Sequence, residues 1–198
     1  MMIVVTGGSG SGKSEIAESY AVQLHKARHA HLDEGLFYVA TMKRNPLDEE
    51  TERRIGRHLQ MRSGKGFRTI ECPVCLGRIR PEAGVYLIED LPNLLANEMW
   101  GEDGALRGGA GKTMDPGDAA GCILEPLEAL AEAGDVVVVT GNVSSDGLRY
   151  ESGTEQYVWL LNRIGAALAA RSQLVVEAVC GIPVTAKGSG TIPETLKV

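Results

Sequence analysis

Short apolar runs recur along the chain, and each is a continuous stretch rich in Val, Ile and Leu rather than an alternation with polar residues. Such runs are typical of strands that are buried on both faces of a parallel sheet. They predict five strands, which are Ile3–Thr6, Leu36–Thr41, Val85–Ile88, Val136–Thr140 and Leu174–Val179.

The segments between these runs carry helical patterns. The predicted helices are Ser14–Lys26, Asp48–Met61, Pro92–Met99, Ile123–Ala133 and Gln156–Ala170. Regular alternation of strand and helix predicts a doubly wound, mostly parallel α/β sheet with helices on both faces. A length of 198 residues fits one domain of this kind, spanning residues 1–198.

The stretch Gly101–Gly121 departs from this pattern, because it is rich in glycine and has no apolar period. We interpret it as a long flexible surface loop. Its role is open between a cover over a substrate site and a plain insertion.

Composition narrows the classes of partner. The formal net charge of −6 argues against a broad, salt-driven attraction to nucleic acid. No run approaches the roughly 18 apolar residues of a membrane span. The chain opens on a strand pattern without a basic leader segment, so we expect a cytoplasmic protein.

Cys72 and Cys75 have C-x-x-C spacing, but no second close pair follows, which favours ordinary reduced cysteines over a zinc site.

A glycine-rich segment between the first strand and the first helix has the spacing of a P-loop. Glycines allow the backbone to curl so that several N–H groups point at phosphates, and the following helix adds its dipole. We expect Lys13 to reach the β- and γ-phosphates and the Ser14 hydroxyl to bind Mg²⁺. The predicted fold is therefore P-loop NTPase-like. The predicted nucleotide-binding residues here are Gly7, Gly8, Ser9, Gly10, Ser11, Gly12, Lys13 and Ser14.

A P-loop also needs an acidic residue at the end of a neighbouring strand, which holds Mg²⁺ through its water shell. Glu89 and Asp90 follow the apolar run Val85–Ile88. We favour Glu89 for the metal, because it directly follows the strand and Asp90 is placed to begin the next helix. In the alternative interpretation both carboxylates only cap that helix.

One histidine lies between two arginines at a spacing of four. If Asp48–Met61 is helical and extends by one residue, Arg54, His58 and Arg62 share a face. Neighbouring positive charge keeps an imidazole neutral and able to act as a nucleophile, and the arginines would bind the phosphates that it attacks. The alternative is an exposed helix face with solvated charges, and spacing alone favours that alternative.

Taken together, these segments resemble the bifunctional adenosylcobinamide kinase/adenosylcobinamide-phosphate guanylyltransferases of cobalamin biosynthesis. The resemblance runs from the first strand to about Lys187 and is strongest in the first half. It rests on Thr6-Gly-Gly-x-x-Ser11-Gly-Lys-Ser14, Tyr38-Val-Ala40-Thr41, Asp48-Glu49, Arg54-Ile55-x-x-His58, Arg68-Thr69-Ile70-Glu71, Glu89 with Asn97, and Gly181-Ile182-Pro183.

The resemblance implies a two-step enzyme. One activity would phosphorylate the aminopropanol hydroxyl of adenosylcobinamide with ATP or GTP. The other would move GMP from GTP onto His58 and then onto adenosylcobinamide phosphate. The resemblance also implies Mg²⁺, a homotrimer, and guanine nucleotide contacts at Ala40, Thr41, Met42, Leu59, Gln60, Met61, Arg62, Glu71 and Glu89.

The second half departs from the family pattern. Gly141-Asn142-Val143 replaces Asn-Glu-Val, which removes a carboxylate, and the segment Glu155–Trp159 loses two basic residues and an acid. Two other functions therefore stay open. One is a small-molecule P-loop kinase without guanylyltransferase activity, and the other is a non-catalytic nucleotide-binding protein.

Overall fold

Seven strands form one sheet in the computed structural model, which describes the chain apart from residues 44–52, 54–55, 57–63, 108–115, 144–149 and 190–198. The strands are β1 (Met2–Gly7), β2 (Gly35–Ala40), β3 (Arg68–Glu71), β4 (Gly84–Glu89), β5 (Asp135–Val139), β6 (Leu174–Val179) and β7 (Ile182–Lys187). Their order across the sheet is β3-β2-β4-β5-β1-β6-β7. All neighbours pair in parallel except β6 and β7, which are antiparallel.

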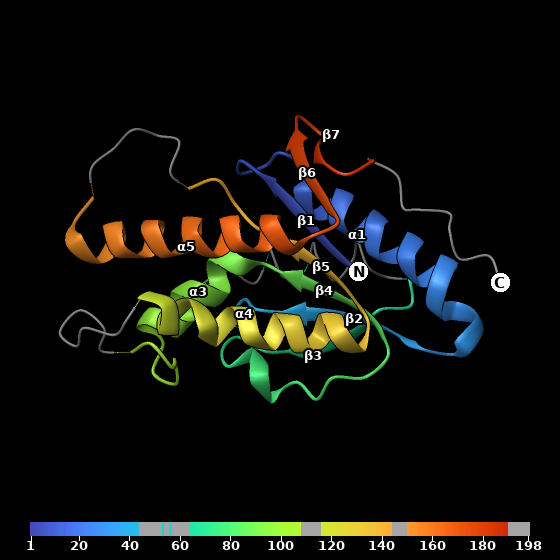
Figure 1. Ribbon diagram of the computed structural model, residues 1–198, viewed down its shortest axis with the longest axis horizontal. Helices are drawn as coiled ribbons and strands as arrows, with labels where there is room; N and C mark the ends of the chain where they lie inside the picture. The colour runs from blue at the N-terminus through green and yellow to red at the C-terminus, as the bar shows by residue number, and fades with distance from the viewer. Residues whose placement is uncertain (44–52, 54–55, 57–63, 108–115, 144–149, 190–198) are drawn as a thin grey trace.

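Helices cover both faces of this sheet (Figure 1). They are α1 (Lys13–Leu24), α3 (Leu91–Trp100), α4 (Pro116–Ala133) and α5 (Ser152–Arg171). A π-helical turn, His25–His29, and a 3₁₀ turn, Ala30–Leu32, continue α1, and a second 3₁₀ turn lies at Leu76–Arg78. The architecture confirms the predicted doubly wound, mostly parallel α/β fold.

The continuous apolar runs supply two cores, because successive side chains of a strand point to opposite faces. In β4, Tyr86 and Ile88 pack toward α3, α4 and α5. Val85 and Leu87 pack toward α1 on the other face. The central strands thus carry consecutive apolar residues, such as Val85–Ile88 in β4 and Val136–Val139 in β5, which explains why no polar alternation is visible in the sequence.

Two strands were not predicted from the pattern. The edge strand β3 is largely exposed and carries charge at both ends, so it lacks a buried run. All six residues of β7 are exposed, and a tight turn at Cys180 and Gly181, both with positive φ, joins it to β6. Strands that bury little apolar surface leave little signal in the sequence.

The predicted loop Gly101–Gly121 is wrong in its last part, because α4 begins at Pro116. The apolar face of α4 continues backward through Ala119 and Ala120, which are buried. Leu106, earlier in the segment, is also buried in the core. Small residues, rather than a recognisable apolar stripe, carry the first turns of this helix.

Most of the predicted helix Asp48–Met61 lies outside the described residues; the two described positions within it, Arg53 and Gly56, are helical. Within the described part of the chain, no helix has both the length and the apolar character that a membrane crossing requires.

Candidate active site

The loop between β1 and α1 has the geometry of a phosphate cradle. Gly7 ends β1 with φ of 153°, and a Cβ there would lie 2.5 Å from Ser11 Oγ and 2.8 Å from the carbonyl oxygen of Ala178. Gly10 and Gly12 have φ of 69° and 88°, which L side chains rarely adopt. The glycines predicted from the motif are therefore demanded by the backbone at these three positions.

The turn between β6 and β7 contacts the phosphate loop and holds its backbone. The backbone N–H of Gly181 donates to the carbonyl of Ser11 at 2.8 Å. A Cβ on Gly12 would lie 3.1 Å from the Cα of Gly181, so the two segments touch closely. The sequence singled out Gly181 only through the family resemblance, and the structure gives it this supporting role.

Two side chains of the loop carry polar groups suited to phosphate. The Lys13 ammonium is exposed and folds back to donate to the carbonyl of Gly8 at 3.2 Å. The Ser11 hydroxyl is buried and has no hydrogen-bond partner among the described residues. A buried hydroxyl without a partner is costly, and a phosphate oxygen would satisfy it.

Ser14 and Glu89 meet at the head of the loop. The Ser14 hydroxyl donates to Glu89 Oε1 at 2.6 Å, across 75 residues of sequence. Burial raises the pKa of Glu89 to about 7, with Asp90 and Glu18 adding to the rise, while Ser14 and Lys13 oppose it. A divalent cation would reverse this, because it stabilises the ionised carboxylate. The pair therefore fits Mg²⁺, with a hydroxyl and a carboxyl oxygen as donors of the kind that the ion prefers.

The structure separates the two acidic residues after β4. Asp90 accepts a hydrogen bond of 2.9 Å from the backbone N–H of Asn93 and so caps α3. The hydrogen bond from Ser14 is accepted by Glu89. The carboxylate chosen from the sequence for the metal is thus the one that the fold brings to the phosphate loop.

Thr41 holds the end of β4 in place rather than facing outward. It is fully buried, its N–H donates to the carbonyl of Glu89, and its hydroxyl lies 2.8 and 2.9 Å from the carbonyl oxygens of Glu89 and Asp90. Asn97 adds a second clasp, because its amide donates to the carbonyls of Thr41 at 2.8 Å and Pro73 at 3.0 Å. Ala40 and Met42 are partly exposed on either side of Thr41.

Glu71 does not lie at the phosphate loop. It ends β3, pairs in register with Ala40 and is exposed. Four strand spacings separate β3 from β1, which amounts to about 19 Å. A contact of Glu71 with nucleotide would have to involve a part of the nucleotide far from the P-loop.

The segment that carries the predicted nucleophile lies outside the described residues, and this includes His58, Arg54 and Arg62 together with Leu59, Gln60 and Met61. The structure does describe the residues on either side of this segment. It leaves the sheet after Ala40, at the carboxyl end of β2, and Lys65 on the return pairs with Glu18 at 2.5 Å. Glu18 lies one helical turn beyond Ser14, so both ends lie near the Ser14–Glu89 pair.

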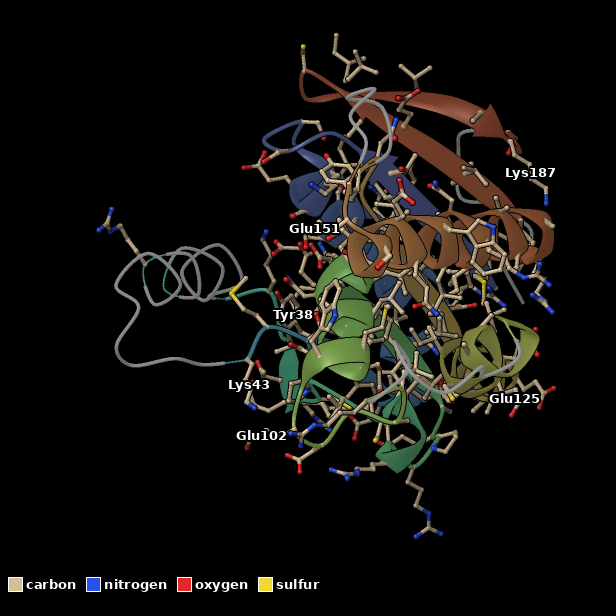
Figure 2. The ribbon with its side chains drawn as sticks, turned by 90° about the vertical axis from the view of Figure 1, so that its left-hand side faces the viewer. Tyr38, Lys43, Glu102, Glu125, Glu151 and Lys187 are labelled. Atoms are coloured by element: carbon tan, nitrogen blue, oxygen red, sulfur yellow. The ribbon has the colours of Figure 1, made fainter. Side chains whose placement is uncertain are left out.

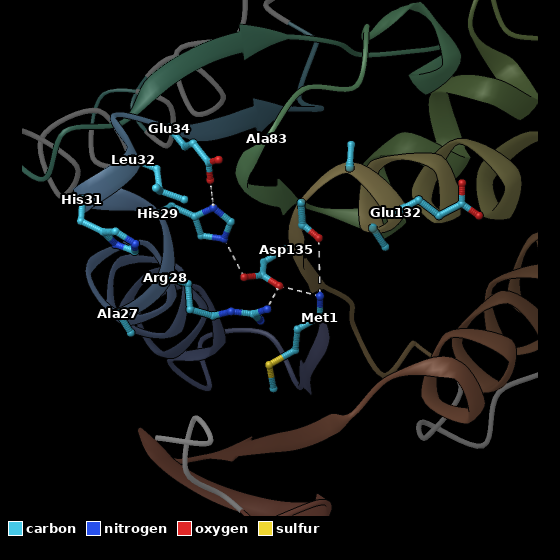
Figure 3. Close-up of a pocket in the computed structure, with 13 residues that line it drawn as sticks. Met1, Ala27, Arg28, His29, His31, Leu32, Glu34, Ala83, Glu132 and Asp135 are labelled. Atoms are coloured by element: carbon cyan, nitrogen blue, oxygen red, sulfur yellow. Dashed lines mark hydrogen bonds and ion pairs between the residues drawn. The ribbon is translucent and has the colours of Figure 1, made fainter. Parts of the chain in front are cut away.

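A second polar cluster occupies the opposite end of the sheet and was not predicted. His29 lies between Glu34, 2.5 Å from Nδ1, and Asp135, 2.7 Å from Nε2 (Figure 3). Asp135 also pairs with Arg28 at 2.8 Å and with the Met1 amino group. These residues line an open cavity of about 880 Å³ beside the start of β5. The charges are paired with one another, which indicates a role in joining α1 to the sheet.

The fold and the glycine cradle between β1 and α1 place the chain in the P-loop NTPase-like class. Residues 3–186 match the model of the family described as cobinamide kinase / cobinamide phosphate guanyltransferase (CobU), and the chain belongs to this family. The family comprises kinases and guanylyltransferases of cobalamin biosynthesis whose substrates include GTP and ATP.

The other comparisons are more distant. No curated protein is similar to the chain at a significant level. The chain is similar to the flagellar accessory protein FlaH from Methanocaldococcus jannaschii, with 12% identity and a TM-score of 0.44. That match covers 95% of this chain and 78% of FlaH.

Proposed function

We propose that this chain phosphorylates adenosylcobinamide with a nucleoside triphosphate and then transfers GMP from GTP, through guanylylated His58, to adenosylcobinamide phosphate. The observation that carries the first step is the 2.6 Å hydrogen bond between Ser14 and Glu89 at the head of the glycine cradle. Membership of the family supplies the substrate class.

In the first step the chain's groups hold and polarise the triphosphate. The loop N–H groups and the N-terminus of α1 bind the phosphates, and Lys13 neutralises charge that develops on the transferring group. Ser14 and Glu89 would hold Mg²⁺, which would neutralise negative charge of the triphosphate. The acceptor hydroxyl forms a bond to the γ-phosphorus, loses its proton, and the nucleoside diphosphate leaves.

In the second step His58 acts as a covalent carrier. An imidazole nitrogen forms a bond to the α-phosphorus of GTP, and the bond to the departing pyrophosphate breaks. An oxygen of adenosylcobinamide phosphate then attacks the same phosphorus and releases the imidazole, giving a diphosphate linkage. Arg54 and Arg62 would bind the phosphates during both displacements. The return of this segment beside Glu18 supports a position near the phosphate loop.

A labelling experiment tests the covalent step. The protein is incubated with Mg²⁺ and GTP labelled at the α-phosphate, denatured, and examined for an acid-labile adduct. We expect an adduct in the parent chain and in a His31→Ala control, and none in His58→Ala. An adduct that persists in His58→Ala would contradict the assignment of the nucleophile.

The two alternative functions are distinguished by adding a second assay, in which triphosphate labelled at the γ-phosphate reports phosphoryl transfer to adenosylcobinamide. Phosphorylation of adenosylcobinamide without any adduct would identify a plain kinase. Nucleotide binding without either reaction would identify a non-catalytic protein. The latter is favoured by the missing carboxylate at Gly141-Asn142, which directly follows β5 beside the loop, where Asn142 N–H donates to the carbonyl of Gly7 at 3.4 Å.

The assembly and setting are further parts of the proposal. We expect a cytoplasmic homotrimer that acts on a small corrinoid and binds no nucleic acid. Light scattering after size-exclusion chromatography tests the trimer, since a mass of one chain or two would contradict it. Comparison of initial rates with ATP and with GTP identifies the phosphate donor.

A further inference from the structure

An aromatic pair joins α3, the helix that follows β4, to α5. Trp100, the last residue of α3, is 55% exposed. Its ring centroid lies 5.3 Å from that of Tyr157 on α5, with the planes tilted by 35°. An indole that is half in water but held against a second ring is a surface able to stack with a ligand.

Hydrogen bonding fixes the tyrosine of this pair at the start of α3. The Tyr157 hydroxyl donates to the carbonyl of Pro92 at 3.1 Å, and Pro92 is three residues after Glu89. Burial raises the pKa of Tyr157 to about 12, and the charge of Asp90 adds to the rise. The phenol therefore stays a donor at neutral pH and is held at the first turn of α3, close enough to Asp90 to sense its charge.

The tryptophan extends this aromatic surface along the helix. Side chains of a helix lean toward its N-terminus, so the indole of Trp100 points back toward the turn that Tyr157 contacts. The ten residues of α3 span about 15 Å, so Trp100 lies about that far from the start of the helix, which Tyr157 contacts at Pro92. Figure 2 looks onto the end of α3, with α5 above it and Lys43 and Glu102 below.

The aromatic pair lies on α5 and on α3, the helix that follows Glu89 in the chain. The phosphate loop follows β1, and Glu89 ends β4, two strand spacings or about 10 Å away. In-line transfer needs the acceptor opposite the leaving nucleoside diphosphate. The region beyond Glu89, along α3, therefore belongs to the acceptor, and the nucleoside extends away from it.

We propose that Trp100 and Tyr157 form a platform for the flattened, conjugated and largely apolar ring of the corrinoid acceptor, with its aminopropanol arm reaching toward Glu89. This inference rests on the proposed function, because it takes the acceptor class from it. The other occupant that an aromatic surface could accept here is the nucleobase, and the test distinguishes the two.

The test compares variants by calorimetric titration with adenosylcobinamide and by the KM values for adenosylcobinamide and for the triphosphate. For Trp100→Ala we expect affinity for adenosylcobinamide to fall about tenfold, as for a well-packed aromatic contact, with the KM for the triphosphate unchanged. Trp100→Phe should restore part of the loss. Trp159→Ala is the matched control, since Trp159 is 47% exposed and its ring lies under Arg163 instead.

Several outcomes would overturn the platform. Unchanged corrinoid affinity in Trp100→Ala would do so, and so would a raised KM for the triphosphate alone, which would assign the surface to the nucleobase. If the parent chain binds adenosylcobinamide without phosphorylating it, the proposed function fails while the binding comparison still decides the platform. If the parent chain binds none, both fail.

Discussion

The Ser14 hydroxyl and the Glu89 carboxyl are joined by a 2.6 Å hydrogen bond although 75 positions separate them in sequence. Ser14 lies in the first turn of α1, and Glu89 is the last residue of β4. Two strands that are not adjacent in the sheet thus deliver one pair of oxygen donors to the phosphate loop. This pair is the centre of the catalytic site that we propose.

Replacement of Glu89 tests the role of its carboxyl. Glu89→Gln keeps the shape and the oxygen that accepts from Ser14, but it removes the negative charge that would hold Mg²⁺. We expect kcat for phosphorylation of adenosylcobinamide to fall by roughly 100-fold or more, with the folded structure kept. Initial rates over a range of Mg²⁺ concentrations measure the fall in kcat, and circular dichroism checks that the fold is kept. A variant with more than half of the parent activity would contradict the assignment.

The raised pKa of Glu89 makes the stability of the free protein depend on pH. The pKa is about 7 in the folded state, chiefly because of burial, against 4.5 ordinarily, so the native state holds the proton more tightly than the unfolded chain does. This contribution is complete below about pH 4.5 and is lost as pH rises to about 7. We expect the stability of Glu89→Gln to lack this pH-dependent loss, because glutamine does not titrate.

Urea denaturation of the parent chain and of Glu89→Gln between pH 5 and pH 8 measures this contribution. As pH rises, the unfolding free energy of the parent chain should fall relative to that of Glu89→Gln. A difference that is constant over this range would show that the carboxyl titrates normally in the fold.

The backbone of the phosphate loop explains a contrast between two of its glycines. Gly12→Ala forces an L side chain into φ of 88° and brings a Cβ to 3.1 Å from the Cα of Gly181. We expect a loss of about 1–2 kcal/mol in the free energy of unfolding. Gly8→Ala is the control, because a Cβ there meets nothing within 4 Å. Thermal and urea unfolding of both variants without nucleotide would check this, and equal losses would contradict it.

The charged cluster at the far end of the sheet should matter for stability and not for catalysis. His29→Ala removes the imidazole that bridges Glu34 and Asp135. Asp135, which is 1% exposed, is then left with one hydrogen-bond partner fewer. We expect a loss of about 3 kcal/mol in unfolding free energy. His31→Ala, an exposed neighbour, should cost little. Urea unfolding with kinetic assays separates these effects, and a changed kcat in the His29 variant would assign the cluster another role.

Much of the fold could be predicted from local pattern. Five of the seven strands, such as Leu174–Val179, are continuous apolar runs because both faces of the sheet are covered by helices. The strands that escaped prediction, β3 and β7, are exposed and bury too little apolar surface to mark the sequence. The first turns of α4 escaped for a related reason, since Ala119 and Ala120 are small.

By itself the sequence determined the glycine cradle at Gly7–Ser14 and the family to which the chain belongs, because both depend on short motifs of neighbouring residues, those of the family being spread along the chain. The tertiary structure decided the contact of Glu89 with Ser14, the burial of Thr41, the distance of Glu71 from the phosphate loop and the contact between Trp100 and Tyr157. These relationships join segments many residues apart, and the order and direction of the strands set which segments meet. The phosphate loop and its favoured partner Glu89 were thus predictable from the chain alone, whereas the contact of Glu89 with Ser14 and the pairing of Trp100 with Tyr157 required the folded sheet.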